Sequence, residues 1–361
     1  MAYGIRFYLG LHMEKILKSI VYHFHKTIAH IGVRMYFRGI ERNGVETIPK
    51  KGPLIYAVNH QNAFIDAIIV GSITSLPTYY MTRSDVFKPP FDWFLDAFKM
   101  MPIYRIRDGY SSLQKNDDIF DTCTKHLSNK QGLLIFPEGN HGLHHYLRPL
   151  TKGMARIALQ SQSKIEEPIM IIPTGLNYFD HFNSGRKLVI NYGRPISVTD
   201  YMDRYNDHPQ KGLRAITKDV SVAMQEMLII PTKEDNYEEQ KHIFSRSNEH
   251  LTSSELRLKI NDTAFTKPHK TYPILGQVGR LFGILNFPVL LLGRWILKTK
   301  VSQKIFSSSI KIAMIILVFP TWFLLCFLVV GFTVSWPWAF LFFLLQIATL
   351  IIRQELVRLS R

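Results

Sequence analysis

A histidine and an aspartate six positions apart, His60 and Asp66, carry the side chains in this chain best suited to proton transfer. A histidine can take a proton from a hydroxyl near neutral pH, and a carboxylate beside it can fix its tautomer and stabilise the imidazolium. The two residues can meet if the turn entering the predicted helix Ala63–Ile73 bends back. In the alternative interpretation, His60 caps that helix and Asp66 is a solvated acid of its first turn, where acids are favoured. The spacing alone leaves both interpretations open.

The elements that must position these residues are buried strands. Three apolar runs, 53–58, 132–136 and 168–175, each predict such a strand. The first leads into His60, the second leads into Pro-Glu-Gly at 137–139, and the third is predicted to end in a small, open turn. Polar residues at strand ends are typical of the sites of open α/β sheets. The pattern therefore predicts one site at a single edge of a sheet.

Basic residues near these segments could bind a phosphate group. A fourth strand-like segment carries Arg105 and Arg107 on one face, and guanidinium groups bind phosphate bidentately. The alternative is a basic surface strand. Arg148 and Lys152 precede the predicted helix Gly153–Gln162, whose N-terminus would also favour an anion.

The order of these four segments resembles the glycerolipid acyltransferase family, which comprises membrane-associated enzymes that acylate glycerol-3-phosphate or lysophosphatidic acid. The family pattern consists of Asn-His-x4-Asp, a block with arginine, a Pro-Glu-Gly block and a block with an apolar residue before proline. The resemblance covers roughly residues 50–200. The corresponding residues here are Asn59, His60, Asp66, Arg105, Arg107, Pro137, Glu138, Gly139, Ile172 and Pro173.

The sequence departs from the family pattern at two places. Five residues instead of four separate His60 from Asp66, and one extra residue rotates a helical position by about 100°. The turn must therefore absorb it, and this spacing fits a divergent branch of the family with a hydrophobic tail. In addition, His141 stands where the family has an arginine. We assign the phosphate-binding role of that arginine to Arg148 or Lys152, because a neutral imidazole substitutes poorly for a guanidinium.

The resemblance implies an α/β fold with a mixed sheet flanked by helices, like that of glycerol-3-phosphate acyltransferase, and an O-acyltransferase activity. His60 would act as general base and Asp66 would orient it. The acyl donor would be a thioester of CoA or acyl carrier protein, with no further cofactor. A covalent acyl-enzyme would not be required, because the thioester is already activated and no serine or cysteine nucleophile stands in the motif. The expected substrate-binding residues are Asn59, Arg105, Arg107, Glu138, Gly139, Arg148 and Lys152.

Composition favours a membrane as the partner. The formal charge is +16 over 361 residues, which favours an anionic partner, either nucleic acid or an acidic membrane surface. Nucleic acid is not expected, because zinc-finger spacing, an RNP block and a helix-turn-helix pattern are all missing from the sequence. Membrane lipids, the acyl thioester and a glycerol-phosphate acceptor are therefore the expected partners, with acyl carrier protein as a further candidate.

Neither a metal site nor a disulfide is expected. His141, His144 and His145 lack cysteine or acidic partners at ligand spacing. The two cysteines, Cys123 and Cys326, fall in a predicted soluble helix and a predicted membrane span.

The C-terminal tail predicts a pair of membrane-spanning helices at 312–332 and 336–352. Basic residues lie on both sides of the pair, so the positive-inside rule puts both ends, and the catalytic domain, on the cytoplasmic face of a bacterial inner membrane or its equivalent. The segment 281–297 is interrupted by polar residues and is predicted to be interfacial or re-entrant.

The expected organisation has four parts. Membrane-interface helices occupy 1–45, with Met13 as an alternative start, and the catalytic domain occupies 46–230. A polar linker, helical or mobile, spans 231–275, and the membrane region spans 276–361.

Two other functions fit the same sequence. An acyltransferase for another lysolipid or an aminolipid would keep His60 and need fewer phosphate-binding arginines. A non-enzymatic membrane lipid-binding protein would keep the tail and the basic surface and tolerate the loss of His60. An acylation assay with a panel of acceptors, beside His60→Ala, discriminates among these functions.

Overall fold

The fold is that of a computed structural model, which describes residues 2–84, 87, 89, 92–103, 110–261 and 272–360. The strands are β1 Gly39–Asn43, β2 Leu54–Val58, β3 Thr78–Arg83, β4 Met100–Ile103, β5 Gly132–Ile135, β6 Met170–Tyr178, β7 Lys187–Tyr192 and β8 Ile196–Ser197. The helices of the catalytic part are α1 Ala2–Tyr36, α2 Ala63–Ile73, α3 Asp92–Ala97, α4 Tyr110–Ser128, α5 Gly153–Gln162, α6 Met202–Asp207, α7 Pro209–Glu226, α8 Tyr237–Arg246 and α9 Ser253–Ile260. The C-terminal helices are α10 Pro273–Leu281, α11 Phe287–Thr299, α12 Ser307–Ala313, α13 Phe319–Thr333 and α14 Trp336–Leu359, with the short turns η6 Lys304–Phe306 and η7 Met314–Val318.

The strands form one mixed sheet in the order β1-β7-β6-β2-β5-β3-β4, with β8 paired to β6. The pairs β2–β5, β2–β6, β3–β5, β3–β4 and β1–β7 are parallel, whereas β6 runs antiparallel to β7 and β8. Because β2 is central and parallel to both neighbours, its carboxyl end opens at the edge where such sheets hold their sites.

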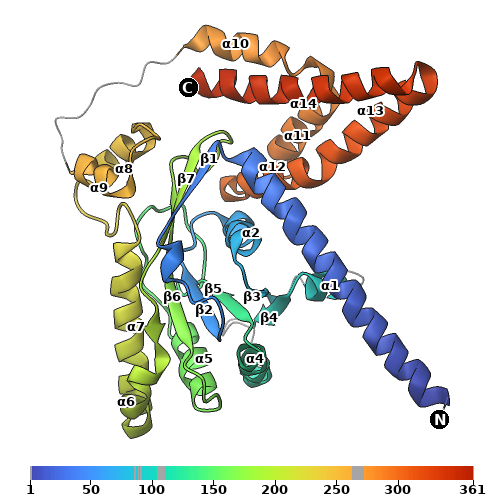
Figure 1. The fold of residues 1–361 in the computed structure, drawn as a ribbon. Coiled ribbons are helices and arrows are strands. Elements are labelled where there is room, and N and C mark those ends of the chain that lie inside the picture. Colours follow the sequence, from blue (N-terminus) through green and yellow to red (C-terminus); the bar gives the residue numbers. More distant parts are fainter. Residues whose placement is uncertain are drawn as a thin grey trace.

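Alternation along β2 divides the core into two layers. Leu54, Tyr56 and Val58 face one cluster, whereas Ile55 and Ala57 face the other, as the two-residue period of a strand requires. Helices α1, α2 and α12 cover the first face, and α4, α5 and α7 cover the second (Figure 1). The predicted fold class, a mixed sheet flanked by helices, is confirmed.

Strand β6 is longer than the sequence predicts. The expected turn at 173–175 is absent, and β6 continues to Tyr178. Up to Thr174 it pairs in parallel with β2, and from Thr174 onward it pairs antiparallel with β7. The prediction of a turn there was wrong, because β7 supplies the backbone partners that β2 no longer provides.

Two segments outside the predicted catalytic domain also pack on the sheet. Strand β1 lies within 1–45 and pairs with β7. Helices α8 and α9, in the segment expected to be a polar linker, bury Tyr237, Phe244 and Leu256 against Phe179 of the β6–β7 connection. The linker therefore contains helices that extend the core.

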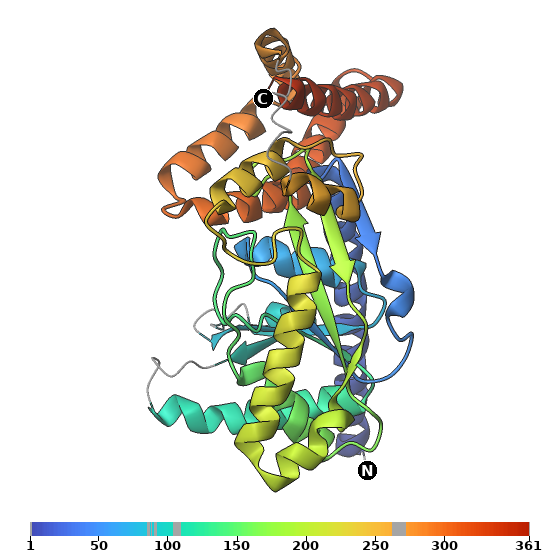
Figure 2. The same cartoon turned by 90° about the vertical axis from the view of Figure 1, so that its left-hand side faces the viewer.

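The C-terminal region holds two helices that are long and apolar enough to cross a membrane, Lys304–Thr333 and Trp336–Leu359. The predicted spans lie inside them. Helix α10 and the segment 284–299 form a pair bent by 56°, which a broken span or a re-entrant loop would adopt. Figures 1 and 2 show all these helices gathered at one end of the molecule.

Candidate active site

The turn between β2 and α2 holds the predicted proton-transfer pair. Asn59 opens this turn and is fully buried, and its amide bonds both backbone groups of Leu176 in β6: Nδ2 donates to the carbonyl at 3.1 Å and Oδ1 accepts from the N–H at 2.7 Å. The turn is thereby anchored to the extended part of β6. The structure places Asn59 under the turn, with both amide groups already occupied.

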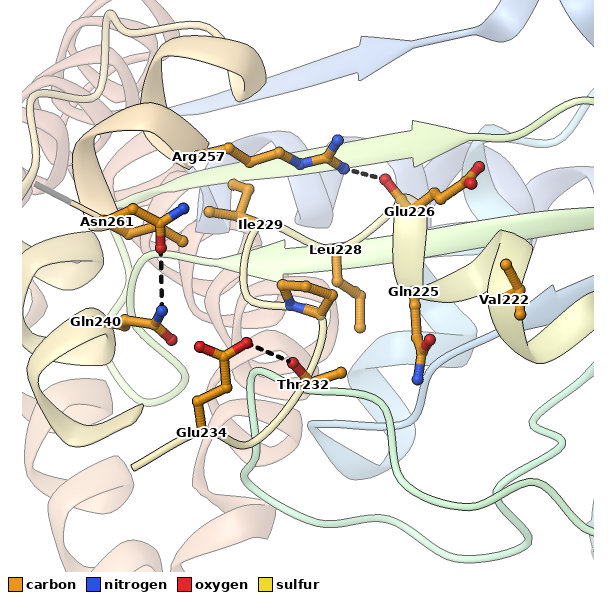
Figure 3. Close-up of a pocket in the computed structure, with 12 residues that line it drawn as sticks. Val222, Gln225, Glu226, Leu228, Ile229, Thr232, Glu234, Gln240, Arg257 and Asn261 are labelled. Carbon is orange, nitrogen blue, oxygen red and sulfur yellow. Dashed lines mark hydrogen bonds between the residues drawn. The ribbon is translucent and has the colours of Figure 1, made fainter. Parts of the chain in front are cut away.

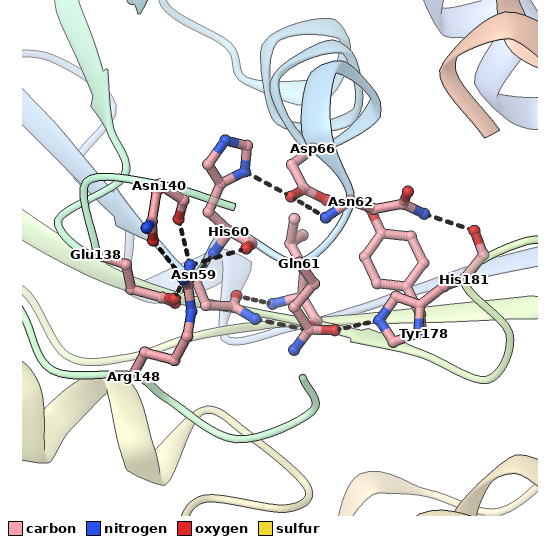
Figure 4. Close-up of polar contacts among 11 residues, drawn as sticks. Asn59, His60, Gln61, Asn62, Asp66, Glu138, Asn140, Arg148, Tyr178 and His181 are labelled. Atoms are coloured by element: carbon pink, nitrogen blue, oxygen red, sulfur yellow. Dashed lines mark hydrogen bonds and ion pairs between the residues drawn. The ribbon is translucent and has the colours of Figure 1, made fainter. Parts of the chain in front are cut away.

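His60 and Asp66 lie in direct contact. His60 Nδ1 is 2.8 Å from Asp66 Oδ2, and the backbone N–H of Asn62 donates to the same oxygen at 2.7 Å (Figure 4). Asp66 is fully buried, so the alternative of a solvated first-turn acid is wrong. Because a carboxylate only accepts hydrogen bonds, His60 donates through Nδ1, which leaves Nε2 as the proton acceptor.

The extra residue between His60 and Asp66 lies in the turn that enters α2. Ala63, the first residue of α2, has φ of +46°, a left-handed conformation that non-glycine residues seldom adopt. This bend brings the first turn of α2 back toward His60. The predicted helix Ala63–Ile73 thus keeps its bounds while Asp66 still reaches the imidazole.

Tyr178 is a third member of this group, which the sequence did not reveal. Its hydroxyl donates to Asp66 Oδ1 at 2.5 Å and is buried. It stands at the end of β6, beyond the point where the strand was predicted to stop. A prediction that extended β6 by three residues, from 175 to 178, would have placed Tyr178 at the site.

A buried ion pair braces the other side of His60. Glu138 accepts from the backbone N–H of His60 at 3.1 Å and pairs with the guanidinium of Arg148. Arg148 also donates to Asn140 and, at 3.3 Å, to the carbonyl of His60. Burial raises the pKa of Glu138 to about 7, although Arg148 and the His60 N–H offset part of the effect.

Gly139 and Gly142 shape the loop that carries this ion pair. Gly139 has φ of +75°, which glycine adopts without strain. The N–H of Gly142 donates to the carbonyl of His60 at 3.0 Å. The Pro-Glu-Gly block therefore lies against the turn of His60, as its position after β5 predicts.

The structure describes two of the four predicted phosphate-binding residues, Arg148 and Lys152. Arg105 and Arg107 lie outside the described residues. The guanidinium of Arg148 is engaged by Glu138, and its side chain is 17% exposed. Lys152 is exposed at the N-terminus of α5 and donates to Gln210 at 3.1 Å; within the described ranges it has no contact with the residues around His60.

Aromatic rings enclose the imidazole. The ring of His60 stacks on Phe136 with centroids 3.9 Å apart, and His141 meets it edge-on at 5.5 Å. His141 in turn contacts Phe306 at 5.5 Å, and Phe64 lies 6.3 Å from Phe306. Phe306 belongs to η6, at the start of the first apolar helix, so the C-terminal region contributes to the surroundings of His60.

Two other features do not belong to this site. A cavity of about 310 Å³ lies between α7 and helices α8 and α9, and none of the residues around His60 line it (Figure 3). No group of three or more histidine, cysteine or acidic side chains that could hold a metal ion is found in the described part of the chain.

Comparison with known proteins gives the class of this domain. Residues 39–177 match the sequence model of the family described as Acyltransferase. This match confirms the resemblance that the four motifs predict.

Among the proteins similar to this chain are two from Saccharomyces cerevisiae. Glycerol-3-phosphate O-acyltransferase 2 is 30% identical over 116 residues, which are 31% of this chain and 15% of the relative. Glycerol-3-phosphate O-acyltransferase 1 is 20% identical over 289 residues, which are 56% of this chain and 38% of the relative. The chain thus spans well under half the length of either relative.

A solved structure also resembles the chain. The 1-acyl-sn-glycerophosphate acyltransferase PlsC from Thermotoga maritima superposes with a TM-score of 0.41 and 15% sequence identity, covering 58% of this chain and 78% of that protein.

Proposed function

We propose that this chain is a membrane-associated O-acyltransferase that moves a fatty acyl group from a thioester of CoA or acyl carrier protein to a hydroxyl of glycerol-3-phosphate or lysophosphatidic acid. The contact between His60 Nδ1 and the buried Asp66 carboxylate carries this proposal. The match of residues 39–177 to the acyltransferase family model supports the class of reaction. The names of the two yeast relatives support the choice of acceptor.

The proposed reaction needs no covalent intermediate. Nε2 of His60 takes the proton of the acceptor hydroxyl while its oxygen attacks the thioester carbonyl, and the Asp66 carboxylate stabilises the imidazolium that forms. When the C–S bond breaks, the imidazolium returns the proton to the leaving thiolate, so that an ester and a free thiol are released. Stacking on Phe136 holds the imidazole in the plane that faces Asp66.

The acceptor head group is the open part of the proposal. The charge of Arg148 is already paired with Glu138, and Lys152 donates to Gln210. Arg105 and Arg107 are therefore the predicted residues left to bind a phosphate. If they do not, an acceptor without a free phosphate, such as another lysolipid or an aminolipid, becomes the better fit. Arg105→Ala should raise the acceptor KM if Arg105 binds the phosphate.

A membrane location fits the acyl substrate. The first of the two long apolar helices begins beside Phe306, which reaches the aromatic surroundings of His60. An acyl chain could therefore pass from the bilayer to His60 along this segment. The basic residues flanking the helices would place the catalytic domain on the cytoplasmic face.

The test is acylation by the purified full chain in lipid nanodiscs. Labelled acyl-CoA and acyl carrier protein would be supplied with glycerol-3-phosphate, lysophosphatidic acid, other lysophospholipids and an aminolipid. His60→Ala should abolish transfer, whereas His250→Ala, at an exposed loop between α8 and α9, should not change it. Transfer by His60→Ala at the wild-type rate would reject the mechanism, and no transfer by the wild type to any acceptor would favour the non-enzymatic lipid-binding function.

A further inference from the structure

The hydroxyl of Tyr178 reaches the carboxylate of Asp66 from the end of β6, on the face of the sheet that α2 covers. Tyr178 ends β6 and is 1% exposed, and its hydroxyl donates to Asp66 Oδ1 at 2.5 Å. Oδ2 receives the other two donors, His60 Nδ1 and the Asn62 N–H. The two oxygens of the Asp66 carboxylate therefore have different hydrogen-bond partners (Figure 4).

We propose that Tyr178 is a positioning residue of the acyl-transfer site, which holds Oδ1 so that Oδ2 faces His60 and which draws part of the negative charge of Asp66 away from the imidazole. This inference rests on the proposed function. It assigns a role to the last residue of β6, which lies outside the apolar-proline motif at Ile172 and Pro173.

Tyr178 is itself rigidly held. Its backbone pairs with Leu188 of β7, and its carbonyl accepts a hydrogen bond from His145 Nε2 at 3.1 Å. Its ring lies 6.0 Å from that of Phe37. Because the backbone and the ring of Tyr178 are both held in place, its hydroxyl can hold Asp66 Oδ1 in one position.

The surroundings keep Tyr178 a neutral donor. Burial, and then the charge of Asp66, raises the pKa of Tyr178 well above its usual value. Burial lowers the pKa of His145 to about 4 and lowers that of His181 well below its usual value, so neither imidazole adds charge near neutral pH. The other titratable or charged groups beside His60 are Glu138 and Arg148, which pair with one another, and His141, whose ring meets that of His60 at 5.5 Å.

This arrangement predicts the direction in which activity changes with pH. A donor at Oδ1 weakens the attraction between Asp66 and the imidazolium, so loss of that donor should favour protonation of His60. His60 must be neutral to act as a base. The acid limb of the pH profile should therefore move to higher pH when the hydroxyl is removed.

The experiment compares Tyr178→Phe with Tyr36→Phe. Tyr36 lies in the same buried cluster, and its hydroxyl contacts the carbonyl of Phe182 at 3.4 Å. For Tyr178→Phe we expect the acid limb of kcat/KM to move up by about half a unit to one unit, kcat to fall about tenfold, and both KM values to stay within about twofold. Tyr36→Phe should change neither the limb nor kcat.

A second replacement keeps the hydroxyl and reverses the effect. 3-Fluorotyrosine at position 178 is a stronger donor, so the acid limb should move to lower pH. If both replacements leave the limb and kcat unchanged, Tyr178 does not position Asp66. Histidine-selective ¹⁵N NMR, assigned with His60→Ala, measures protonation of His60 without turnover. An unchanged titration of His60 in Tyr178→Phe would overturn the inference, whereas inactivity of the wild type would overturn only the proposed function.

Discussion

Replacing Asp66 with asparagine should remove the charge beside His60 and keep the geometry. The backbone N–H of Asn62 points at the position of Oδ2, so the amide oxygen must occupy that position. The NH₂ group then faces Tyr178, whose hydroxyl can reverse and accept. His60 keeps an acceptor for its Nδ1–H and therefore keeps its tautomer.

The loss of charge sets the size of the effect. His60 Nδ1 and Asp66 Oδ2 are 2.8 Å apart, and two unit charges about 4 Å apart attract by about 4 kcal/mol at an effective dielectric constant near 20. If most of this attraction is realised when the imidazolium forms, Asp66→Asn should slow acyl transfer by about 10²- to 10³-fold. The acid limb should also move to lower pH, opposite to the shift expected for Tyr178→Phe.

Asp66→Ala is the matched comparison. It removes the acceptor of the Asn62 N–H and of the Tyr178 hydroxyl, and each donor left unpaired in the core costs about 1–3 kcal/mol. We expect Asp66→Ala to lower the melting temperature clearly and Asp66→Asn to lower it little. An Asp66→Asn rate within about fivefold of wild type, at an unchanged acid limb, would refute the role of the carboxylate charge.

Three further predictions concern residues around the site. Because burial holds the pKa of Glu138 at about 7, above the about 4.3 of an unfolded chain, stability should fall by up to about 3 kcal/mol as pH rises from about 4 to 7. Glu138→Gln should flatten this dependence in thermal unfolding, and equal slopes for both proteins would contradict it. Phe306→Ala should lower kcat/KM several-fold more for long acyl chains than for short ones. The control Phe332→Ala, on the exposed surface of α13, should affect acyl chains of all lengths equally. If Phe306→Ala causes the same loss at every chain length, the acyl chain does not pass beside Phe306. Ala63→Val should lower the free energy of unfolding by about 1–2 kcal/mol or more, because Ala63 is buried and has a left-handed backbone, which a β-branched side chain seldom adopts. Ala63→Gly should stay within about 1 kcal/mol of wild type in the same denaturant unfolding measurement. Equal stability of Ala63→Val and wild type would show that the turn relaxes.

Local sequence patterns were enough to predict the helices and strands that local interactions determine. The apolar runs before His60 and Pro137 predicted β2 and β5, and the bounds of α2 and α5 agree with prediction. The two apolar helices of the tail also follow from uninterrupted hydrophobic length. In each case the deciding interactions, backbone hydrogen bonding and side-chain periodicity, repeat within a few residues.

The parts that the sequence could not supply depend on partners far along the chain. The sequence by itself determined the reaction-capable residue types, the order of the four motifs and the apolar tail. Only the tertiary structure decided that β6 continues to Tyr178, because its ladder partner there is β7, and that the Tyr178 hydroxyl meets Asp66 across 112 positions. It also decided that Arg148 pairs with Glu138 and that Phe306 approaches His141. These contacts have no periodic signature in the sequence, since they arise only when the sheet brings distant strand ends to one edge.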